Sequence, residues 1–398
     1  MALSAVTLIV TQRDRFSLTR ASLESILADY PTYPFQLVYI DGNSPPAVAQ
    51  YLQEQAVRHP FFTLIRQERY LRSNQARNLA LAWMRSNASL PDSVSGSTHT
   101  STDYTPTDYV VFLDNDVVVH PGWLGTLVAA VETHQGAIAS PLILQGQPHD
   151  PNPEIHVAGI ATKFHPRRRD KRWFEQKQLL CGVKLRNVEP AVLQPVVVDA
   201  VEFHTLLIRC DWLERVSLDD QFDSLASHTD LCFQVTALGG KVLLEPRSRV
   251  TFLNPKHIPL FEQSDLALYR FKWSEAYTAQ TFAHSVKKWG LATDDPSLWS
   301  IWRWVIENRQ IPAQLSTAED SWGRRSLQFC QHRRCPGWLR MAIEDTVLRL
   351  NFPEAGISAP LELDPPDPPD PPDPPDPPDP PDPPVNSFTH RTHDPIAP

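Results

Sequence analysis

The sequence lacks long hydrophobic runs. No stretch of about eighteen apolar residues occurs, so we expect no helix that spans a membrane. The N-terminus has no basic segment ahead of an apolar run, which is not the pattern of a signal peptide, and we expect a cytoplasmic protein. Peripheral contact of the protein with the inner membrane surface is an alternative that the sequence leaves open. Residues 167–172 are rich in Arg and Lys, and they either face water or meet an anionic ligand or lipid head groups.

Cysteine is scarce, and basic residues are not in excess. The five cysteines are scattered, which argues against a disulfide framework and favours a reducing compartment. Cys330 and Cys335 have no second ligand pair at the spacing of a zinc site. Nine of the 46 acidic residues and one of the 37 basic residues follow residue 361, so this end carries −8 of the net charge of −9. The remainder is nearly neutral, and we expect no nucleic-acid partner.

Glycine is absent where two classes of nucleotide-binding enzyme need it. Residues 5–11 have the pattern of a first strand, and the turn that follows, residues 12–15, holds no glycine. A Rossmann dehydrogenase needs G-x-G-x-x-G there, because the glycines let the backbone approach a pyrophosphate. A sugar-nucleotide pyrophosphorylase also needs a glycine-rich loop after its first strand. Both classes are therefore disfavoured.

The chain does contain a buried strand that runs into two acids. Residues 109–113 are apolar or aromatic, and Asp114, Asn115 and Asp116 follow. A run that is apolar on both faces is typical of a parallel sheet, where ligands bind beyond the carboxyl ends of the strands. The two carboxylates share a face and repel unless a cation lies between them. The pattern predicts a Mg²⁺ or Mn²⁺ site that also holds substrate phosphates, and a solvated turn is the alternative.

Strand and helix patterns alternate ahead of these acids. The strand patterns cover residues 5–11, 35–41 and 61–65, and the helix patterns cover residues 17–28, 45–58 and 74–83. This alternation predicts an α/β domain with a mostly parallel sheet flanked by helices. Residues 87–107 shift to Ser, Thr, Asp and Pro, which predicts a mobile insertion.

The pattern after the acids is less regular. We expect a helix at 121–133, a strand at 137–144, irregular structure at 145–195, and strands at 241–245 and 249–253. Residues 196–209 have the pattern of one long strand, in which Glu202 and His204 share a face and, when buried, need partners or a ligand. Residues 227–238 have helical spacing, with Ser227 as the N-cap and Asp230 as the third helical residue of a capping box.

The last third of the chain has a different character. From about residue 255 the pattern is helical and rich in tryptophan, with the clearest helices at 262–289 and 337–350. Seven Asp-Pro-Pro units at 364–384 predict an extended polyproline II rod, because consecutive prolines fix φ and remove donors. We therefore expect an α/β domain at 1–255, a helical extension at 256–352 and a disordered Pro-rich tail at 353–398.

Five pieces of the sequence, in this order, resemble those of the family 2 glycosyltransferases. The pieces are the first strand and its turn, Tyr39-Ile40-Asp41-Gly42-Asn43-Ser44, Ala76-Arg77-Asn78-Leu79-Ala80, the DxD-like Leu113-Asp114-Asn115-Asp116, and Asp230-Leu231-Cys232 with Leu238-Gly239-Gly240. The resemblance covers about residues 5–253. It implies the GT-A fold, which is Rossmann-like. It also implies transfer of a sugar from a nucleotide diphosphate sugar to a hydroxyl acceptor, which in this family usually inverts the configuration at the sugar carbon.

The resemblance also implies where the donor binds. Asp41 and the backbone near Thr11 would contact the nucleotide base, and Arg13, Arg77 and Asn115 would lie at the donor. The family often has a second acid directly after the position of Asp41, and this chain does not. UDP is the expected nucleotide of the donor, while GDP and dTDP stay open.

The same resemblance implies a metal and an acceptor site. Asp114 would meet the ribose or the shell of the metal, and Asp116 would bind Mg²⁺ or Mn²⁺, which neutralises the departing diphosphate. His204 is a weak candidate for the acceptor site. The acceptor itself, expected to be a glycan, a polysaccharide or a lipid-linked sugar, would meet residues 145–195 and the Trp-rich helices.

The chain departs from the family at the general base. Members typically carry Glu-Asp-x-Asp at the start of the last helix of the domain, whereas this chain has Ser227-His228-Thr229-Asp230. His228 occupies the position of the base, and a neutral His is a competent base near neutral pH. Three alternatives remain: Asp230 or Glu202 acts as the base, His228 is a further metal ligand as in some retaining enzymes, or the protein is an inactive nucleotide- or carbohydrate-binding protein.

Overall fold

The computed structural model describes most of the chain before residue 352. The described residues are 3–88, 107–167, 171–222, 226–258, 261–315, 322–323, 325–327 and 337–351. The predicted insertion at 87–107 lies almost entirely outside them, as do Cys330, Cys335, part of the basic stretch at 167–172, and the tail at 353–398.

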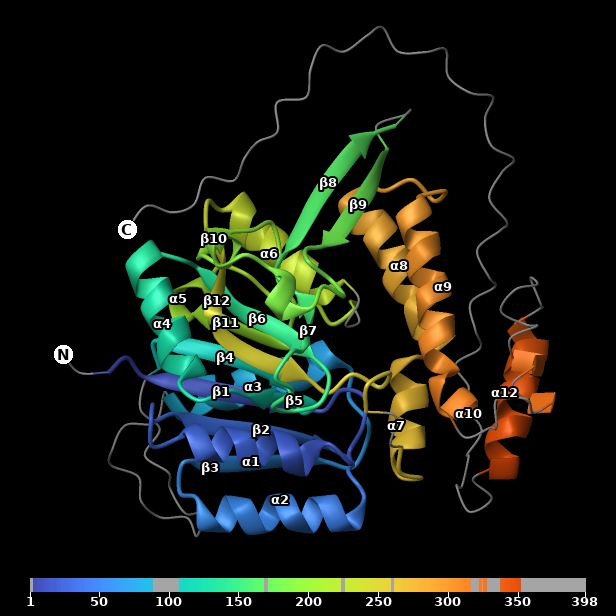
Figure 1. Ribbon diagram of the computed structural model, residues 1–398, viewed down its shortest axis with the longest axis horizontal. Helices are drawn as coiled ribbons and strands as arrows, with labels where there is room; N and C mark the ends of the chain where they lie inside the picture. The colour runs from blue at the N-terminus through green and yellow to red at the C-terminus, as the bar shows by residue number, and fades with distance from the viewer. Residues whose placement is uncertain are drawn as a thin grey trace, which may run out of the picture.

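Ten strands form the main sheet of the described residues (Figure 1). They are β1 (Val6–Thr11), β2 (Gln36–Gly42), β3 (Phe62–Gln67), β4 (Tyr109–Asp114), β5 (Val117–Val119), β6 (Ile138–Gln145), β7 (Glu154–Val157), β10 (Val196–Val197), β11 (Thr205–Arg209) and β12 (Val242–Phe252). Their order is β10-β12-β6-β11-β4-β1-β2-β3, with β5 paired to β12 and β7 to β6. The long strands run parallel except β11, which is antiparallel to β4 and β6. The predicted mostly parallel sheet is confirmed.

Helices flank this sheet. They are α1 (Thr19–Asp29), α2 (Pro46–Arg58), α3 (Ser73–Ala88), α4 (Trp123–His134), the short α5 (Cys210–Leu213) and α6 (Ser227–Ala237). Helix α3 packs on β1 and β2, α2 packs on β3, and α4 packs on β6 and β12. All of these helices except α5 coincide with helical patterns of the sequence.

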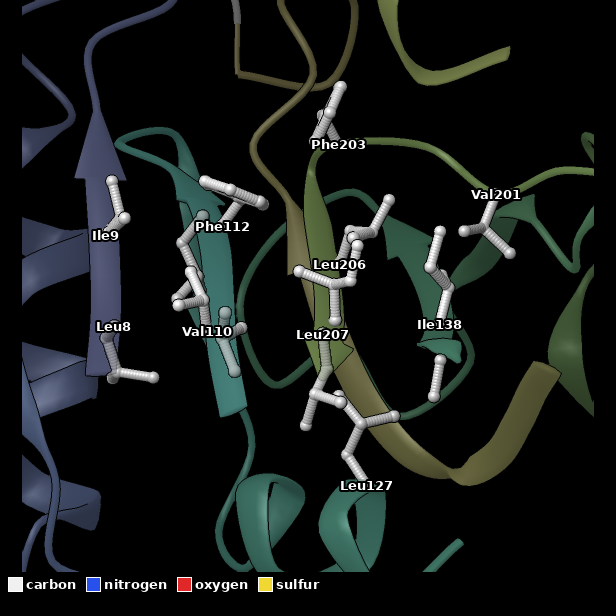
Figure 2. Packing of buried hydrophobic residues seen from close by; sticks show 14 of the residues in the cluster. Leu8, Ile9, Val110, Phe112, Leu127, Ile138, Val201, Phe203, Leu206 and Leu207 are labelled. Carbon is white, nitrogen blue, oxygen red and sulfur yellow. The ribbon is translucent and has the colours of Figure 1, made fainter. Parts of the chain in front are cut away.

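The core lies at the centre of the sheet. Every residue of β1, β4 and β6 is buried, as expected for parallel strands covered on both faces. Figure 2 shows side chains of β1, β4, β6 and β11 beside one another, with Leu127 of α4 reaching them from one side. Burying one such Leu, Ile or Phe contributes about 1.5–3 kcal/mol, so these strands hold the sheet edge in place.

Two predictions about the second half of the domain are wrong. Residues 145–195 are not irregular throughout, because β7 joins the main sheet and β8 (Ile160–Pro166) and β9 (Arg172–Gln178) form a separate hairpin that projects from it (Figure 1). Residues 196–209 are not one strand, because β10 and β11 are separated by residues 198–204. Glu202 and His204 therefore lie in a bend ahead of β11 and not on a common strand face.

The helical extension is confirmed in outline. It contains α7 (Asp265–Lys272), α8 (Glu275–Trp289), α9 (Pro296–Arg309), α10 (Ile311–Leu315) and α12 (Gly337–Asn351). The helix predicted at 262–289 is broken at Trp273 and Ser274, and α8 ends at Gly290, whose φ of +66° favours glycine. Among the described residues, no helix has both the length and the apolar character needed to cross a bilayer.

Candidate active site

The predicted acids lie where the order of the strands changes direction. From β1 the chain passes to β2 and β3 on one side and to β4 on the other, and Thr11 at the end of β1 is in register with Asp114 at the end of β4. In such sheets, the crevice outside the carboxyl ends of the strands at this switch point is the usual place for a ligand. Asn115 N–H donates to Thr11 O at 3.0 Å and fixes the turn that carries Asp116.

Asp114 is a buried carboxylate whose two oxygens are both used. Arg77 Nη2 donates to Oδ1 at 3.0 Å, and Arg13 Nη1 donates to Oδ2 at 3.2 Å. His204 Nδ1 lies 3.4 Å from Oδ2. Burial opposes ionisation, but the hydrogen bond from His204 and the charges of the two arginines hold the pKa of Asp114 well below its ordinary value. Asp114 is therefore ionised.

Asp116 is equally buried, but neither of its carboxylate oxygens has a hydrogen-bond partner among the described residues. Burial raises the pKa of Asp116 to about 7; the Arg13 charge opposes this, and Asp14 and Asp114 add to it. An orphaned carboxylate of this kind costs about 1–3 kcal/mol or more unless a ligand satisfies it. A divalent cation is a fitting ligand, because hard cations take carboxylate oxygens.

His204 connects this acid pair to a second group. Its ring lies 1% exposed against Phe252, with ring centroids 4.0 Å apart, and its Nε2 is 3.5 Å from Glu202 Oε2. Glu202 Oε2 also lies 3.1 Å from His156 Nε2, and Glu202 Oε1 accepts from Gln178 Nε2 at 2.5 Å. Asp114, Asp116, Glu202, His204 and His156 are called the sheet-edge cluster below.

Two sets of ligand atoms in the sheet-edge cluster are close enough to hold a metal ion. One set is Asp114, Asp116 and His204, and the other is His156, Glu202 and His204. Burial and the Arg13 charge lower the pKa of His204 to about 3, so its ring is neutral and retains a lone pair. Despite burial, His156 and the hydrogen bond from it hold the pKa of Glu202 well below its ordinary value.

Sequence reasoning did not single out His156. It lies on β7, in the stretch expected to be irregular, yet Ile155 and Val157 are buried on either side of it. This alternation of apolar and polar residues over four positions was the available signal. The antiparallel pairing of β7 with β6 places His156 at the sheet edge where β4 also ends.

The remaining predicted donor residues are held by internal contacts. Asp41 accepts from Gln12 Nε2 at 2.9 Å, from the backbone and hydroxyl of Ser44, and from Arg66 Nη1 at 2.5 Å. Asn115 accepts from Arg13 N and donates to Arg15 O, so it ties the turn after β1 to the turn after β4. Thr11 is 1% exposed, and its hydroxyl has no hydrogen-bond partner in the part of the chain that the structure describes.

The predicted base candidates occupy different surroundings. His228 is the second residue of α6, is 6% exposed, and is close enough to Glu202 for their charges to interact. Asp230 lies on the same helix, but Lys288 Nζ donates to its Oδ2 at 2.9 Å and Trp289 Nε1 to its Oδ1 at 3.2 Å. The capping role expected for Ser227 is wrong: the N-cap is Ala226, and no side chain caps the helix.

A pocket next to the sheet-edge cluster is lined by cations that come from separate parts of the chain. The turn after β1, the start of α3, and the helices α7 and α8 surround it, and its polar lining is Gln12, Arg13, Arg72, Ser73, Lys272 and Tyr277. Arg72 lies over the Tyr277 ring with 3.8 Å to its centroid, and it donates to Gln280 at 2.6 Å. Lys272 Nζ is 3.6 Å from buried Asp14. No sequence pattern pointed to Arg72 or Lys272, because only folding brings the extension to this edge.

A comparison with models of known protein families found one match. Residues 93–185, which include Asp114, Asp116 and His156, match the model described as Glycosyl transferase family 2. This stretch is therefore similar to the family 2 glycosyltransferases. It covers 93 of the 398 residues and includes β4, β5, β6, β7, β8 and β9.

Solved structures similar to this protein share little of its sequence. A crystal structure of GalNAc-T7 with UDP, GalNAc and Mn²⁺ has 16% identity and a TM-score of 0.46, and the alignment covers 77% of this chain and 56% of that one. Residues 1–349 of TarS from S. aureus have 12% identity and a TM-score of 0.39, with 86% and 90% covered. The complex of TarS with UDP-GlcNAc has 11% identity, the same TM-score and the same coverage. No curated protein sequence matches the chain.

The structure brings most of the predicted site residues to one edge of the sheet. Asp114 and Asp116 lie there with Glu202 and His204, and Arg13 and Arg77 supply the cations that contact Asp114. Asp41 lies at the same edge but with its carboxylate in internal hydrogen bonds. Asp230 is turned toward α8.

Proposed function

We propose that this protein is a glycosyltransferase that transfers a sugar, with a divalent metal ion, from a nucleotide diphosphate sugar to a hydroxyl acceptor. One observation carries the proposal: Asp116 is a fully buried carboxylate beyond the carboxyl end of β4, at the switch point of the sheet, and no residue that the structure describes gives it a hydrogen bond. The sheet core does not need this group, and burying it costs free energy. A bound cation satisfies it.

Asp116 and Asp114 would hold the metal ion, with Mg²⁺ or Mn²⁺ as the expected ion. When bound, the ion stabilises the charge that develops on the departing diphosphate. Arg77, 1% exposed and with its guanidinium 3.8 Å from the Phe203 ring centroid, keeps Asp114 ionised and fixed in orientation. The two acids thus have different roles: Asp114 is fixed by arginines, whereas the oxygens of Asp116 would bind the metal ion.

The pocket beside the two acids supports a phosphate-bearing donor. Arg13, Arg72 and Lys272 converge on it from three segments of the chain. Arginine and lysine side chains recognise phosphate through charge-assisted hydrogen bonds. We take UDP as the first nucleotide to test, on the resemblance to the family, with GDP and dTDP as alternatives.

His228 is the proposed general base for an inverting transfer. A base must lie within hydrogen-bond reach of the hydroxyl that it deprotonates, and His228 stands at the sequence position of the family's base. Asp230 is less suited, because Lys288 and Trp289 already contact both of its oxygens. Glu202 is also committed, to Gln178 and His156. The acceptor, a glycan, polysaccharide or lipid-linked sugar, would approach from the side of the β8–β9 hairpin and α8.

A cytoplasmic location is part of the proposal. Three described cysteines are free: Cys181 is exposed, Cys210 is half-buried and Cys232 is buried. Free thiols at three different depths suit a reducing compartment. Contact with an anionic membrane surface would use the basic residues Arg167, Lys171 and Arg172, of which Lys171 and Arg172 are exposed.

A panel of thermal shifts tests the proposal. We expect one of UDP, GDP, dTDP or CDP to raise the melting temperature of the full chain only when Mn²⁺ is present. In the Asp116→Asn variant, the metal-dependent part of this shift should disappear. Asp211→Asn is the matched control, because Asp211 is a surface acid paired with Arg209 far from the site. Equal shifts with and without Mn²⁺, or an unchanged shift in Asp116→Asn, would contradict the metal site.

A second candidate function is favoured by the replacement of the family's Glu-Asp by Ser227-His228. A chain without a working base would bind a nucleotide sugar and not turn it over. Release of the free nucleotide from the donor that gives a shift, measured with and without candidate acceptors, separates the two functions. Binding without release under any condition would favour the inactive binding protein.

A further inference from the structure

His204 lies at the meeting point of the two sets of possible metal ligands, and the proposed function has no role for it. It is buried in the bend ahead of β11, directly beside the acids at the end of β4. Its Nδ1 is 3.4 Å from Asp114 Oδ2 and 4.0 Å from Asp116 Oδ1. These are the separations expected of atoms that surround one cation, because metal-to-ligand distances of about 2.0–2.2 Å place neighbouring ligand atoms roughly 3–4 Å apart.

The other side of the ring is supported in the way that metal-binding histidines usually are. A histidine that binds a metal through one nitrogen commonly donates its second N–H to a carboxylate, which fixes the ring. His204 Nε2 faces Glu202 Oε2 at 3.5 Å, and Glu202 is held in turn by His156 and Gln178. In the metal-free protein Nδ1 faces Asp114 as a hydrogen-bond donor. A bound metal requires the ring proton on Nε2 instead, and the lone pair of Nδ1 then points toward Asp114 and Asp116.

Arg13 occupies the space in which this cation would sit. Its Nη1 lies 2.5 Å from the ring nitrogens of His204 and 3.2 Å from Asp114 Oδ2, and its charge interacts with Asp116 and Glu202. The guanidinium thus provides the positive charge that the clustered carboxylates require. Arg13 also lines the pocket with Arg72 and Lys272, so its side chain has an anionic ligand to bind when a metal replaces it.

We propose that His204 is the third protein ligand of the metal ion held by Asp114 and Asp116, and that it makes the site prefer Mn²⁺ to Mg²⁺. Glu202 is a positioning residue that orients the ring of His204. This inference rests on the proposed function, since it concerns the same metal ion. Mg²⁺ takes oxygen ligands in an octahedral arrangement, whereas imidazole nitrogen suits transition-metal ions, so one nitrogen ligand favours Mn²⁺.

The test measures binding of Mn²⁺ alone to the full chain, without nucleotide. Titration followed by the electron paramagnetic resonance of free Mn²⁺ gives the affinity, and spin-echo spectra of bound Mn²⁺ report whether a nitrogen ligand is present. We expect nitrogen coupling in the unsubstituted protein and its loss in His204→Asn. Mn²⁺ affinity should fall by about tenfold or more in this variant, while Mg²⁺ affinity, measured by competition, changes less.

Two further variants sharpen the assignment. Glu202→Gln should weaken Mn²⁺ binding by about tenfold yet keep the nitrogen coupling, because His204 remains a ligand. His165→Asn is the matched control, since His165 is also paired with a glutamate, Glu175 at 2.8 Å, but on the exposed hairpin. It should bind Mn²⁺ like the unsubstituted protein.

The spectra of the unsubstituted protein keep the proposal testable even when a variant does not fold. Bound Mn²⁺ without nitrogen coupling, or equal affinity in folded His204→Asn, overturns the role of His204. If Asp116→Asn still abolishes binding in that case, the proposed metal-dependent function stands without it. If the unsubstituted protein binds no Mn²⁺ with or without UDP, both proposals fail.

Discussion

Two buried acids of this protein lie in opposite situations. Asp116 in the sheet-edge cluster is 0% exposed, and within the described part of the chain neither of its oxygens has a hydrogen-bond partner. Asp230 on α6 is 3% exposed, and Lys288, Trp289 and Gln234 contact its oxygens. Residue type and burial are nearly the same, but the partners differ. A satisfied buried acid stabilises the fold, whereas an unsatisfied one is kept for a ligand.

The surroundings of Asp230 form a junction between the two parts of the chain. Lys288 of α8 contacts both Asp219 and Asp230 at 2.8 and 2.9 Å, and His284 contacts Asp219 at 2.8 Å. Trp289 stacks on Phe222 with ring centroids 5.2 Å apart. We call this group the α6–α8 junction. Its charges compensate one another, so its expected role is to hold the extension against the α/β domain.

The largest expected effect is on catalysis, and it separates two residues of α6, His228 and Asp230. His228→Ala should lower kcat by about 10²–10⁴ if His228 is the general base. Asp230→Asn should lower it far less, because its carboxylate is committed to α8. Steady-state release of nucleotide from the donor measures both. A loss under about tenfold in His228→Ala would move the role of the base to Glu202 or Asp230.

Substitution of the two buried acids, Asp116 and Asp230, should change the free energy of unfolding in opposite directions. In the metal-free protein at pH 8, Asp116→Asn should raise the free energy of unfolding by about 1 kcal/mol or more, because it removes an unsatisfied buried charge. Asp230→Asn should lower it by about 1–2 kcal/mol, because it breaks a pair whose lysine is partly exposed to solvent. Urea denaturation measures both values.

Lys288→Met is the companion variant for Asp230→Asn. It removes the same pair from the other side and should also destabilise the protein. The expected contrast would be lost if Asp116→Asn destabilised the metal-free protein as much as Asp230→Asn does.

The smallest expected effect is a pH dependence at the α6–α8 junction. Burial of Asp219 acts to raise its pKa, but hydrogen bonds from Lys288 and His284 outweigh this and lower the pKa of Asp219 to about 2. A lowered folded-state pKa adds stability above the unfolded pKa, about 3.9 for Asp, and this stability is lost as the pH falls toward 2. After allowance for solvent screening, Asp219→Asn should cost about 1 kcal/mol at pH 6 and almost nothing at pH 2. A difference that is independent of pH would contradict this assignment.

The predicted fold followed from local patterns. The apolar runs that became β1, β2, β4 and β6 are buried on both faces, so they could be recognised without knowledge of their neighbours. The patterns failed where a strand is short or interrupted. The bend at 198–204 joins two apolar segments, and their continuous apolar character hides the change of direction.

The candidate site was predictable only in part. The spacing of Asp114 and Asp116 after a buried strand placed both acids at the sheet edge, because position in a parallel strand determines which end a residue occupies. The spacing could not predict which of the two carboxylates would have hydrogen-bond partners in the folded protein. That depends on Arg13 and Arg77, which arrive from the turn after β1 and from α3.

The sequence by itself determined the class of sheet, the end of it that carries the acids, and the resemblance to a family. Tertiary structure alone decided the partners of each charged group. It brought His156 and His204 to the acids, Lys272 to the pocket, and α8 to Asp230. The reason is physical: backbone periodicity is a property of neighbouring residues, whereas the satisfaction of a buried charge depends on side chains that folding brings together from distant segments.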